Sequence, residues 1–353
     1  MKPMKHILVI RLSALGDVAM TIPVIYSVAR TYPNIAFTVL TQAVASKLFI
    51  QAPENVSVVV ADVKGRHAGI SGLWRLFQEL RRRHVDAVAD LHDVLRSKWL
   101  RFWFSVSGTT CVVIDKGRAE KRRLTSRTHK QFRPLKSSFA RYEEVFVRLG
   151  LTFVPHFTSL YGDKKGATTL FSEIVPDKAE NEIWIGVAPF AKHKGKIYPV
   201  GQMEQVVAHL ADKENCRLFL FGGGDEEIQV FNRWKSRYPG IISMGGKHGF
   251  EKELALISHL DVMITMDSAN MHLASLVGVR VVSVWGATHP YAGFLGWNQS
   301  ASDALGVELP CRPCSVFGNK PCFRGDYACM GQLPPESIVQ KVEQLLAEKN
   351  SME

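Results

Sequence analysis

The feature that most constrains the fold is a repeated alternation of short β-branched segments with apolar-faced helical segments. In the first half of the chain, helical stretches such as 68–83 and 94–107 separate strand-like segments at 6–12, 36–40, 56–62, 86–92 and 111–115. Alternating strands and helices are typical of a parallel sheet covered by helices on both faces. The first half therefore predicts an α/β domain with a doubly wound sheet.

The alternation starts again in the second half. Helical segments such as 201–212, 226–237 and 250–260 separate strand-like segments at 183–189, 217–223, 241–246, 262–267 and 281–286. The stretch near 165–182 has the composition of a linker. We therefore expect two Rossmann-like doubly wound domains, residues 1–170 and 180–353, that face a central cleft. Such sheets bind ligands at the carboxyl ends of their strands, so the residues after each strand are the candidate site residues.

The first strand is followed by RLSALGDV at 11–18. Gly16 permits a tight turn, and Asp17 would lie at the start of a helix, where backbone N–H groups hold an anion at the edge of the sheet. Asp17 is therefore a candidate general base, with a simple helix cap as the alternative. The dinucleotide fingerprint G-x-G-x-x-G is absent, which argues against a nicotinamide-dependent oxidoreductase.

A loop rich in lysine follows the strand that ends at Pro189. It contains Lys192, Lys194 and Lys196 together with His193, just before a helix expected from Val200 onward. Positive side chains and helix N–H groups converge in such a loop, which suits a diphosphate. A solvated loop is the alternative.

Two more strands of the second half end in turns suited to a ligand. In FGGGDEE at 221–227, Gly223 would allow close approach, and the next carboxylates would suit a ribose diol. In MDSANMH at 266–272, small residues would expose N–H groups to a phosphate while His272 supplies a donor. A buried structural role is the alternative for His272. A polar loop, WGATHP, follows at 285–290.

The chain is strongly basic, with 44 Lys and Arg against 33 Asp and Glu and a formal charge of +11. Most of the excess lies between residues 60 and 140, so this region should attract a polyanion such as nucleic acid, anionic lipid or a phosphorylated glycan. A nucleic-acid-binding protein is one alternative, but the chain lacks interleaved aromatic residues and any recognised binding motif.

Cysteine usage and hydropathy suggest the compartment. The sequence shows no apolar export segment and no window of about 18 uninterrupted apolar residues. We therefore expect a cytoplasmic protein whose six cysteines are thiols or metal ligands rather than disulfides. Their spacing leaves a structural zinc site open for the four that cluster near the end of the chain, Cys311, Cys314, Cys322 and Cys329.

Taken together, the motifs resemble the heptosyltransferases of glycosyltransferase family nine. The matching features are RLSALGDV, the Lys-x-Tyr-Pro turn, GGGDEE, the D-S-x-x-x-H helix start and WGATHP, in this order over nearly the whole chain. The resemblance implies a GT-B architecture and an inverting transferase that uses an ADP-heptose donor. It also implies that no divalent metal or other cofactor is required. A nucleotide-sugar epimerase of the same fold is the alternative enzyme, although it has no need of a large anionic acceptor site.

The resemblance also implies roles for individual residues. Asp17 matches the catalytic base, and Lys196 matches the lysine that stabilises the departing diphosphate. The chain departs from the family pattern at Ala269, where a glycine is usual, and at Ala191 and Lys192, where threonines are common. The donor site would comprise Lys192, Gly223, Glu226 at the ribose, His248 at the adenine, Asp267 at the sugar hydroxyls, and Ser268, Ala269 and His272 at the phosphates.

The acceptor implied by the resemblance is a lipid-linked lipopolysaccharide core, which carries acidic sugars and phosphates. The basic region fits such an acceptor and predicts peripheral contact with the cytoplasmic face of the inner membrane, where each Lys or Arg gains roughly 1 kcal/mol. No nucleic-acid partner is expected. The acceptor-side candidates are Ser13, Lys64, Arg66, Arg96, Arg122, Arg123 and Arg127.

Overall fold

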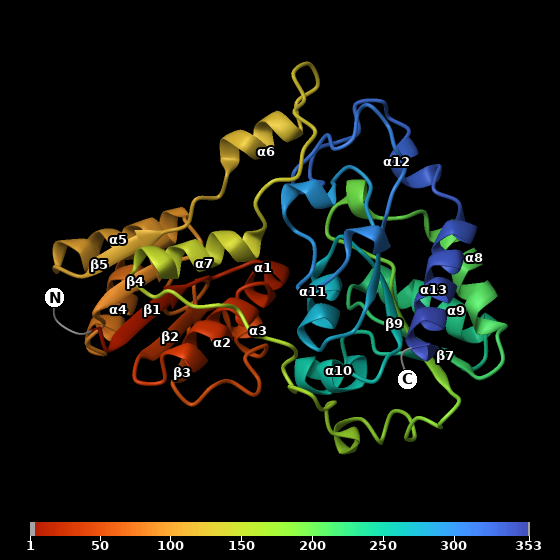
Figure 1. Ribbon diagram of the computed structural model, residues 1–353, viewed down its shortest axis with the longest axis horizontal. Helices are drawn as coiled ribbons and strands as arrows, with labels where there is room; N and C mark the ends of the chain where they lie inside the picture. Colours follow the sequence, from red (N-terminus) through yellow and green to blue (C-terminus); the bar gives the residue numbers. More distant parts are fainter. Residues whose placement is uncertain (1–3, 352–353) are drawn as a thin grey trace. The chain divides into compact units, whose positions relative to one another are not determined.

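The computed structural model describes residues 4–351, and the first three and last two residues of the predicted domains lie outside this range. Two compact units divide the chain (Figure 1). Unit 1 comprises Met1–Lys116 and Ser137–Leu160, and unit 2 comprises Gly117–Lys136 and Tyr161–Glu353. Each unit contains one parallel sheet with flanking helices, so the predicted α/β fold class with two doubly wound sheets is confirmed.

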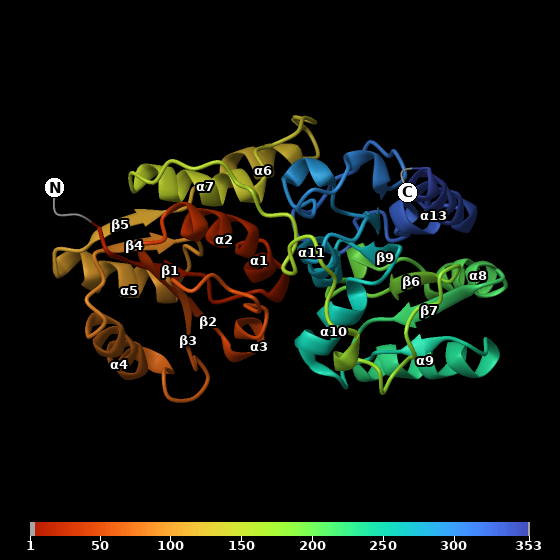
Figure 2. The same ribbon diagram turned by 60° about the horizontal axis from the view of Figure 1, so that its bottom comes forward.

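Unit 1 contains a five-stranded sheet with the order β3-β2-β1-β4-β5. Its pairs are parallel, and β1 lies between β2 and β4, with Ile10 opposite Leu40 and Asp90. Figure 2 shows α2 and α7 on one face of this sheet and α4 and α5 on the other. The strands are β1 His6–Ile10, β2 Ala36–Thr41, β3 Val56–Val60, β4 Ala87–Asp90 and β5 Thr110–Val113. The helices are α1 Leu15–Ala19, α2 Ile22–Thr31, α3 Ala43–Ser46, α4 Gly69–Arg81, α5 Leu95–Val106 and α7 Ser138–Arg148.

Unit 2 contains a six-stranded sheet with the order β11-β10-β9-β6-β7-β8. The buried strands β6, β9 and β10 lie at its centre, and α8 and α13 pack together over one face (Figure 2). The strands are β6 Ile183–Ala188, β7 Cys216–Leu220, β8 Ile242–Ser243, β9 Val262–Met266, β10 Val281–Val284 and β11 Ala304–Leu305. The helices are α6 Arg118–Leu124, α8 Val200–Ala211, α9 Asp225–Arg237, α10 Gly249–Ile257, α11 Ala269–Leu276, α12 Ala328–Gly331 and α13 Pro335–Asn350, with short 3-10 turns at Thr168–Leu170, Lys194–Lys196, Pro290–Ala292 and Ala301–Asp303.

The units begin and end at different residues from the predicted domains, because the segment Gly117–Lys136 belongs to unit 2. Its contacts explain the difference. The Lys130 ammonium donates to the carbonyls of Pro310 and Arg312 at 2.9 and 2.8 Å, and the Phe132 ring lies 4.9 Å from that of Tyr291. Hydrogen bonds and ring packing over this distance in sequence leave no periodic signal, so the pattern of strands and helices could not reveal them.

Candidate functional site

Asp17 occupies the predicted turn at the carboxyl end of β1. It is the third residue of α1, and its carboxylate accepts the Ala14 N–H at 3.2 Å, which is a helix-capping contact. The same oxygen, Oδ2, lies 2.8 Å from Nη2 of Arg11. Asp17 is thus both a cap and half of an ion pair, so the two interpretations of this residue from sequence are not exclusive.

Arg11 is buried beneath Asp17 and fixed from several sides. Its guanidinium donates to the Leu91 carbonyl at 2.7 Å and lies 6.0 Å from the centre of the Tyr142 ring. Burial works to lower the pKa of Arg11, but Tyr142 and Asp17 outweigh it and the pKa is raised. Arg11 is therefore a permanent cation that holds the Asp17 carboxylate in place. The sequence contained it in the motif but gave no reason to assign it a role.

The turn after the neighbouring strand β4 contributes His92, which the sequence reasoning also missed. Its ring Nδ1 accepts the Leu12 N–H at 3.2 Å, and its backbone N–H donates to the Asp90 carboxylate at 2.9 Å. Burial, and then the charges of Arg11 and Lys116, lower the pKa of His92 to about 3. His92 is therefore neutral at physiological pH and braces the loop that leads to Asp17. The signal that could have found it was its position after a buried strand.

In unit 2, Lys196 and Asp267 meet at the carboxyl ends of two adjacent strands. Lys196 ends the 3-10 turn that follows β6, Asp267 directly follows β9, and these strands pair in parallel. The Lys196 Nζ lies 2.9 Å from Asp267 Oδ2, although the two groups are not aligned as a hydrogen bond. The structure therefore brings together the two residues predicted at the diphosphate and at the donor sugar. Lys192 is exposed in the same loop.

The residues predicted at the phosphates lie at the start of α11. Ser268 is the N-cap in an extended conformation, but its hydroxyl lies 3.1 Å from that of Thr265 instead of capping the helix. Ala269 begins the helix, and His272 is buried one turn later. Ser268 makes no side-chain hydrogen bond to the first backbone N–H groups of α11, and N–H groups at the start of a helix are the kind that bind anions.

The two glutamates that follow the glycine turn after β7 have different surroundings. Glu227 Oε2 accepts the N–H of Gly223 at 2.8 Å and so caps α9, whereas the neighbouring Glu226 is exposed. A Cβ on Gly223 would lie 3.6 Å from the Cα of Gly246, so this turn lies against the loop that leads to His248, the N-cap of α10. Glu226 and His248 therefore come from two loops that adjoin.

A segment near the end of the chain packs against the turn that contains Lys196. The sequence did not predict this contact. Gly318 has a φ of +72°, and a Cβ there would lie only 2.4 Å from Cγ of Lys196. The carbonyl of Gly195 accepts the Ala287 N–H at 2.8 Å, and the Ala287 carbonyl accepts the N–H of Ser315 at 3.1 Å. Hydrogen bonds and a glycine contact thus connect the cysteine-rich segment to Lys196.

The four clustered cysteines line one small cavity in unit 2 together with residues such as Arg312 and Tyr327. All are free thiols. Burial raises the pKa of Cys329 to about 11, which favours the protonated thiol. Within residues 4–351 there is no group of three or more His, Cys, Asp or Glu residues placed to hold a metal ion. The zinc site that the spacing left open is therefore not assembled by this arrangement.

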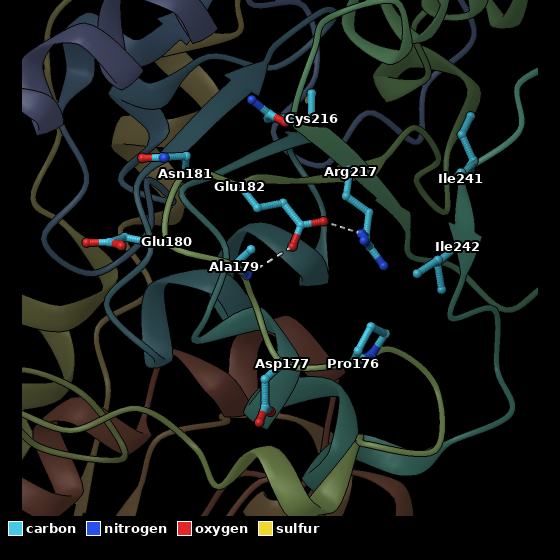
Figure 3. Close-up of a pocket in the computed structure, with 12 residues that line it drawn as sticks. Pro176, Asp177, Ala179, Glu180, Asn181, Glu182, Cys216, Arg217, Ile241 and Ile242 are labelled. Carbon is cyan, nitrogen blue, oxygen red and sulfur yellow. Dashed lines mark hydrogen bonds and ion pairs between the residues drawn. The ribbon is translucent and has the colours of Figure 1, made fainter.

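A cavity of about 800 Å³ in unit 2 lies at the other edge of the sheet (Figure 3). Its lining includes Glu182, Cys216 and Ile242, which precede or begin β6, β7 and β8. Glu182 is paired there with Arg217 at 2.5 Å. Doubly wound sheets bind their ligands at the carboxyl ends of the strands, so we do not assign this cavity to the donor.

The residues predicted on the acceptor side fall in both units. Ser13, Lys64, Arg66 and Arg96 belong to unit 1, where Arg66 is paired with Glu79. Arg122 and Arg123 belong to unit 2. A cavity of about 260 Å³ in unit 2 is lined by Arg122, Arg127 and Lys320 with Thr125, Ser126, Cys314, Pro321 and Phe323. Three cations and two hydroxyl side chains give this cavity the character of an anion site.

Two doubly wound parallel sheets, each with an ion pair at its carboxyl edge, place the chain in the GT-B fold class. Comparison with known proteins makes this specific: the chain belongs to glycosyltransferase family 9, the heptosyltransferases, whose model matches residues 73–321. The predicted family is thus confirmed. The epimerase and nucleic-acid alternatives are set aside.

Individual relatives are distant in sequence, but the similarity extends over nearly the whole chain. The chain is 20% identical to lipooligosaccharide heptosyltransferase 2 of Campylobacter jejuni over 94% of its own length and 96% of the relative. A family 9 glycosyltransferase from Veillonella parvula superposes with a TM-score of 0.74 at 20% identity, covering 99% of each chain. The E. coli heptosyltransferase WaaC with ADP-2-deoxy-2-fluoro heptose gives a TM-score of 0.65 at 17% identity, covering 96% and 99%.

Proposed function

We propose that this protein transfers a heptose or a related sugar from an ADP-sugar donor to a lipopolysaccharide inner-core acceptor. Transfer would invert the anomeric centre and need no divalent metal. The observation that carries the proposal is the Lys196–Asp267 pair at the sheet edge where α11 begins. It combines a cation, a carboxylate and helix N–H groups, which are the groups that a sugar diphosphate requires.

The proposed reaction is a single displacement. The acceptor hydroxyl oxygen attacks the anomeric carbon while the bond from that carbon to the diphosphate oxygen breaks. Asp17 accepts the hydroxyl proton, and ADP departs with the bonding electron pair. Lys196 stabilises the charge that develops on the diphosphate. Because attack and departure occur on opposite sides of the carbon, the configuration inverts.

The donor contacts follow from the arrangement in unit 2. Glu226 would bind the ribose and His248 the adenine, from two loops that meet at Gly223 and Gly246. Lys192, Ser268, Ala269 and His272 would surround the phosphates, while Asp267 would accept hydrogen bonds from the sugar hydroxyls. The donor named with the E. coli relative, an ADP-heptose analogue, supports an ADP-sugar.

The positive charge of one cavity in unit 2 supports an anionic acceptor. The cavity lined by Arg122, Arg127 and Lys320 suits the phosphates or acidic sugars of an inner core. Among residues 4–351, no helix is long and apolar enough to cross a bilayer. A lipid-linked acceptor would bring the enzyme to a membrane surface, so the proposal includes a cytoplasmic enzyme in peripheral contact with the inner membrane.

A donor screen tests this proposal. The purified protein is incubated with extracted lipid-linked core and with ADP-heptose, other ADP-sugars, or UDP- and GDP-sugars, and the anomeric configuration of the product is measured by NMR. We expect transfer from an ADP-sugar with inversion. A preference for UDP- or GDP-sugars, or a product with retained configuration, would contradict the donor or the mechanism respectively.

A further inference from the structure

Helix α5 exposes an apolar stripe on the side that does not pack in unit 1. Leu95, Phe102 and Val106 are separated by seven and then four residues, so they lie on one face of the helix, and their side chains are 86%, 58% and 64% exposed. The opposite side of α5 is buried through Leu100 and Phe104. The helix is therefore apolar on two sides, and packing in unit 1 uses one of them.

Helix α4 extends this surface. It packs beside α5 (Figures 1 and 2), and its Trp74 ring lies 4.9 Å from the Trp103 ring and 6.2 Å from the Trp99 ring. Trp74 is exposed, as is Ile70 one turn earlier on the same helix. We call this surface the α4–α5 face, formed by Ile70, Trp74, Leu95, Trp99, Phe102, Trp103 and Val106. Trp99 and Trp103 are half-buried, and the Trp103 ring lies between the exposed residues of the two helices, 4.9 Å from Trp74 and 5.4 Å from Phe102. A patch of exposed large apolar residues marks an interaction site.

The charged residues of helices α4 and α5 are almost all positive, although Lys98 lies 3.7 Å from the carboxylate of Asp93, just before α5. Helix α5 contains no acidic residue, and the one acidic residue of α4, Glu79, is paired with Arg66 and His67. The exposed cations on the two helices are Arg75, Arg81, Arg96 and Lys98. The expectation from the sequence that the basic region lacks interleaved aromatic residues is therefore wrong, because the exposed Trp74 and Phe102 lie among Arg and Lys. Such a combination is typical of a surface that inserts into the headgroup region of an anionic bilayer.

We propose that the α4–α5 face docks unit 1 on an anionic lipid bilayer. The apolar stripe would enter the boundary between headgroups and acyl chains, while Arg75, Arg81 and Lys98 would lie against the anionic headgroups. A second copy of the chain is a poorer occupant, because self-association through this face would bring two sets of like charges together. The lipid surface satisfies both the apolar and the cationic side chains.

The position of the α4–α5 face in unit 1 suggests how docking would serve catalysis. This step of the inference rests on the proposed function. Helix α5 begins at Leu95, directly after the loop that contains His92. His92 in turn contacts the turn that leads from β1 to Asp17. The exposed stripe therefore starts at the edge of the sheet where the proposed base lies, so a bilayer bound there would present its lipid-linked acceptor to that edge.

Vesicle binding tests the docking without any substrate. The full chain is sedimented with vesicles of phosphatidylethanolamine and phosphatidylglycerol, and with vesicles of phosphatidylcholine alone. We expect binding to the anionic vesicles that weakens as salt increases. The double variant Phe102→Ser/Val106→Ser should lower the partition coefficient about tenfold or more, whereas Val147→Ser/Val154→Ser, which removes two exposed valines elsewhere in unit 1, should change it less than twofold.

Three outcomes would overturn the proposal: no binding of the wild type to anionic vesicles, equal losses in the two double variants, or a wild-type oligomer that the first variant alone converts to monomer in analytical ultracentrifugation. Turnover separates this proposal from the proposed function. The Phe102→Ser/Val106→Ser variant should retain wild-type turnover with a deacylated, water-soluble acceptor and lose it with acceptor in vesicles. Absence of transfer from every donor, with vesicle binding intact, would contradict the proposed function alone.

Discussion

The two units each contain an ion pair at the carboxyl edge of their sheet, and the pairs are built in opposite ways. In unit 1 the cation is the buried partner: the Arg11 side chain is 8% exposed and that of Asp17 is 30% exposed. In unit 2 the carboxylate is the buried partner, with Asp267 6% and Lys196 16% exposed. Unit 1 thus presents an anion and unit 2 a cation. A proton acceptor must be the exposed anion, and a group that meets a departing diphosphate must be the exposed cation.

The largest effect should come from neutralising the anion of unit 1. Asp17→Asn keeps an oxygen that can accept the Ala14 N–H but loses the charge, so we expect kcat to fall at least about 10²-fold while ADP affinity stays near the wild-type value. Turnover with ADP-heptose and ADP binding by calorimetry are the measurements. Near-normal turnover would remove Asp17 from the chemistry and leave it as a helix cap.

Removing the cation of unit 2 should lower kcat less than the loss of the Asp17 charge does, and it should also weaken ADP binding. Lys196→Ala should weaken ADP binding and lower kcat, each by about tenfold or more, because the charge meets the diphosphate before and during departure. Lys194→Ala is the matched control, since Lys194 lies in the same turn but its ammonium is 5.0 Å from the centre of the Tyr327 ring. Equal effects of the two variants would show that the turn contributes general positive charge and not a positioned lysine.

Disturbing the contact between the cysteine-rich segment and Lys196 should change the KM for the donor by a few fold. Gly318→Ala places a methyl group against the Lys196 side chain, whereas Gly325→Ala, at a similar φ of +81°, meets no atom within 4 Å. Both substitutions strain the backbone, so their difference isolates the contact. We expect Gly318→Ala alone to raise the KM for the donor.

A double-mutant cycle sharpens this comparison. If Gly318 acts through Lys196, adding Gly318→Ala to Lys196→Ala should raise KM little further. Independent, additive effects on KM would mean that Gly318 serves the fold of the segment and not the position of the lysine.

The smallest effect is expected from removing metal ions. The groups assigned to the diphosphate are Lys192, Lys196, Ser268 and His272, whereas divalent cations prefer oxygen ligands that include carboxylates. Activity should survive excess EDTA with at most a small loss. If EDTA abolishes turnover, Mg²⁺ restores it and circular dichroism shows an unchanged fold, the cation of unit 2 does not replace a metal, and Asp267 becomes a candidate metal ligand.

Much of the candidate site could be predicted because its residues lie at the ends of strands. Asp17, Lys196 and Asp267 each follow a β-branched run, and parallel sheets place such residues at one edge. The partners of these residues could not be predicted. Arg11 and His92 act on Asp17 through contacts between β1 and β4, which are far apart in the sequence. Glu227, and not Glu226, caps α9 because of the conformation of the glycine turn.

The sequence by itself determined the two α/β units, the turns proposed to bind ligands and the family, because periodicity and turn chemistry are properties of consecutive residues. Only the tertiary structure decided that Gly117–Lys136 belongs to unit 2, that Gly318 supports Lys196, and that the cysteines do not assemble a metal site. It also decided which apolar side of α5 stays exposed, since Leu100 and Leu95 are equally apolar in the sequence. Burial and charge pairing depend on which strands and helices become neighbours, and those contacts are made between segments far apart along the chain.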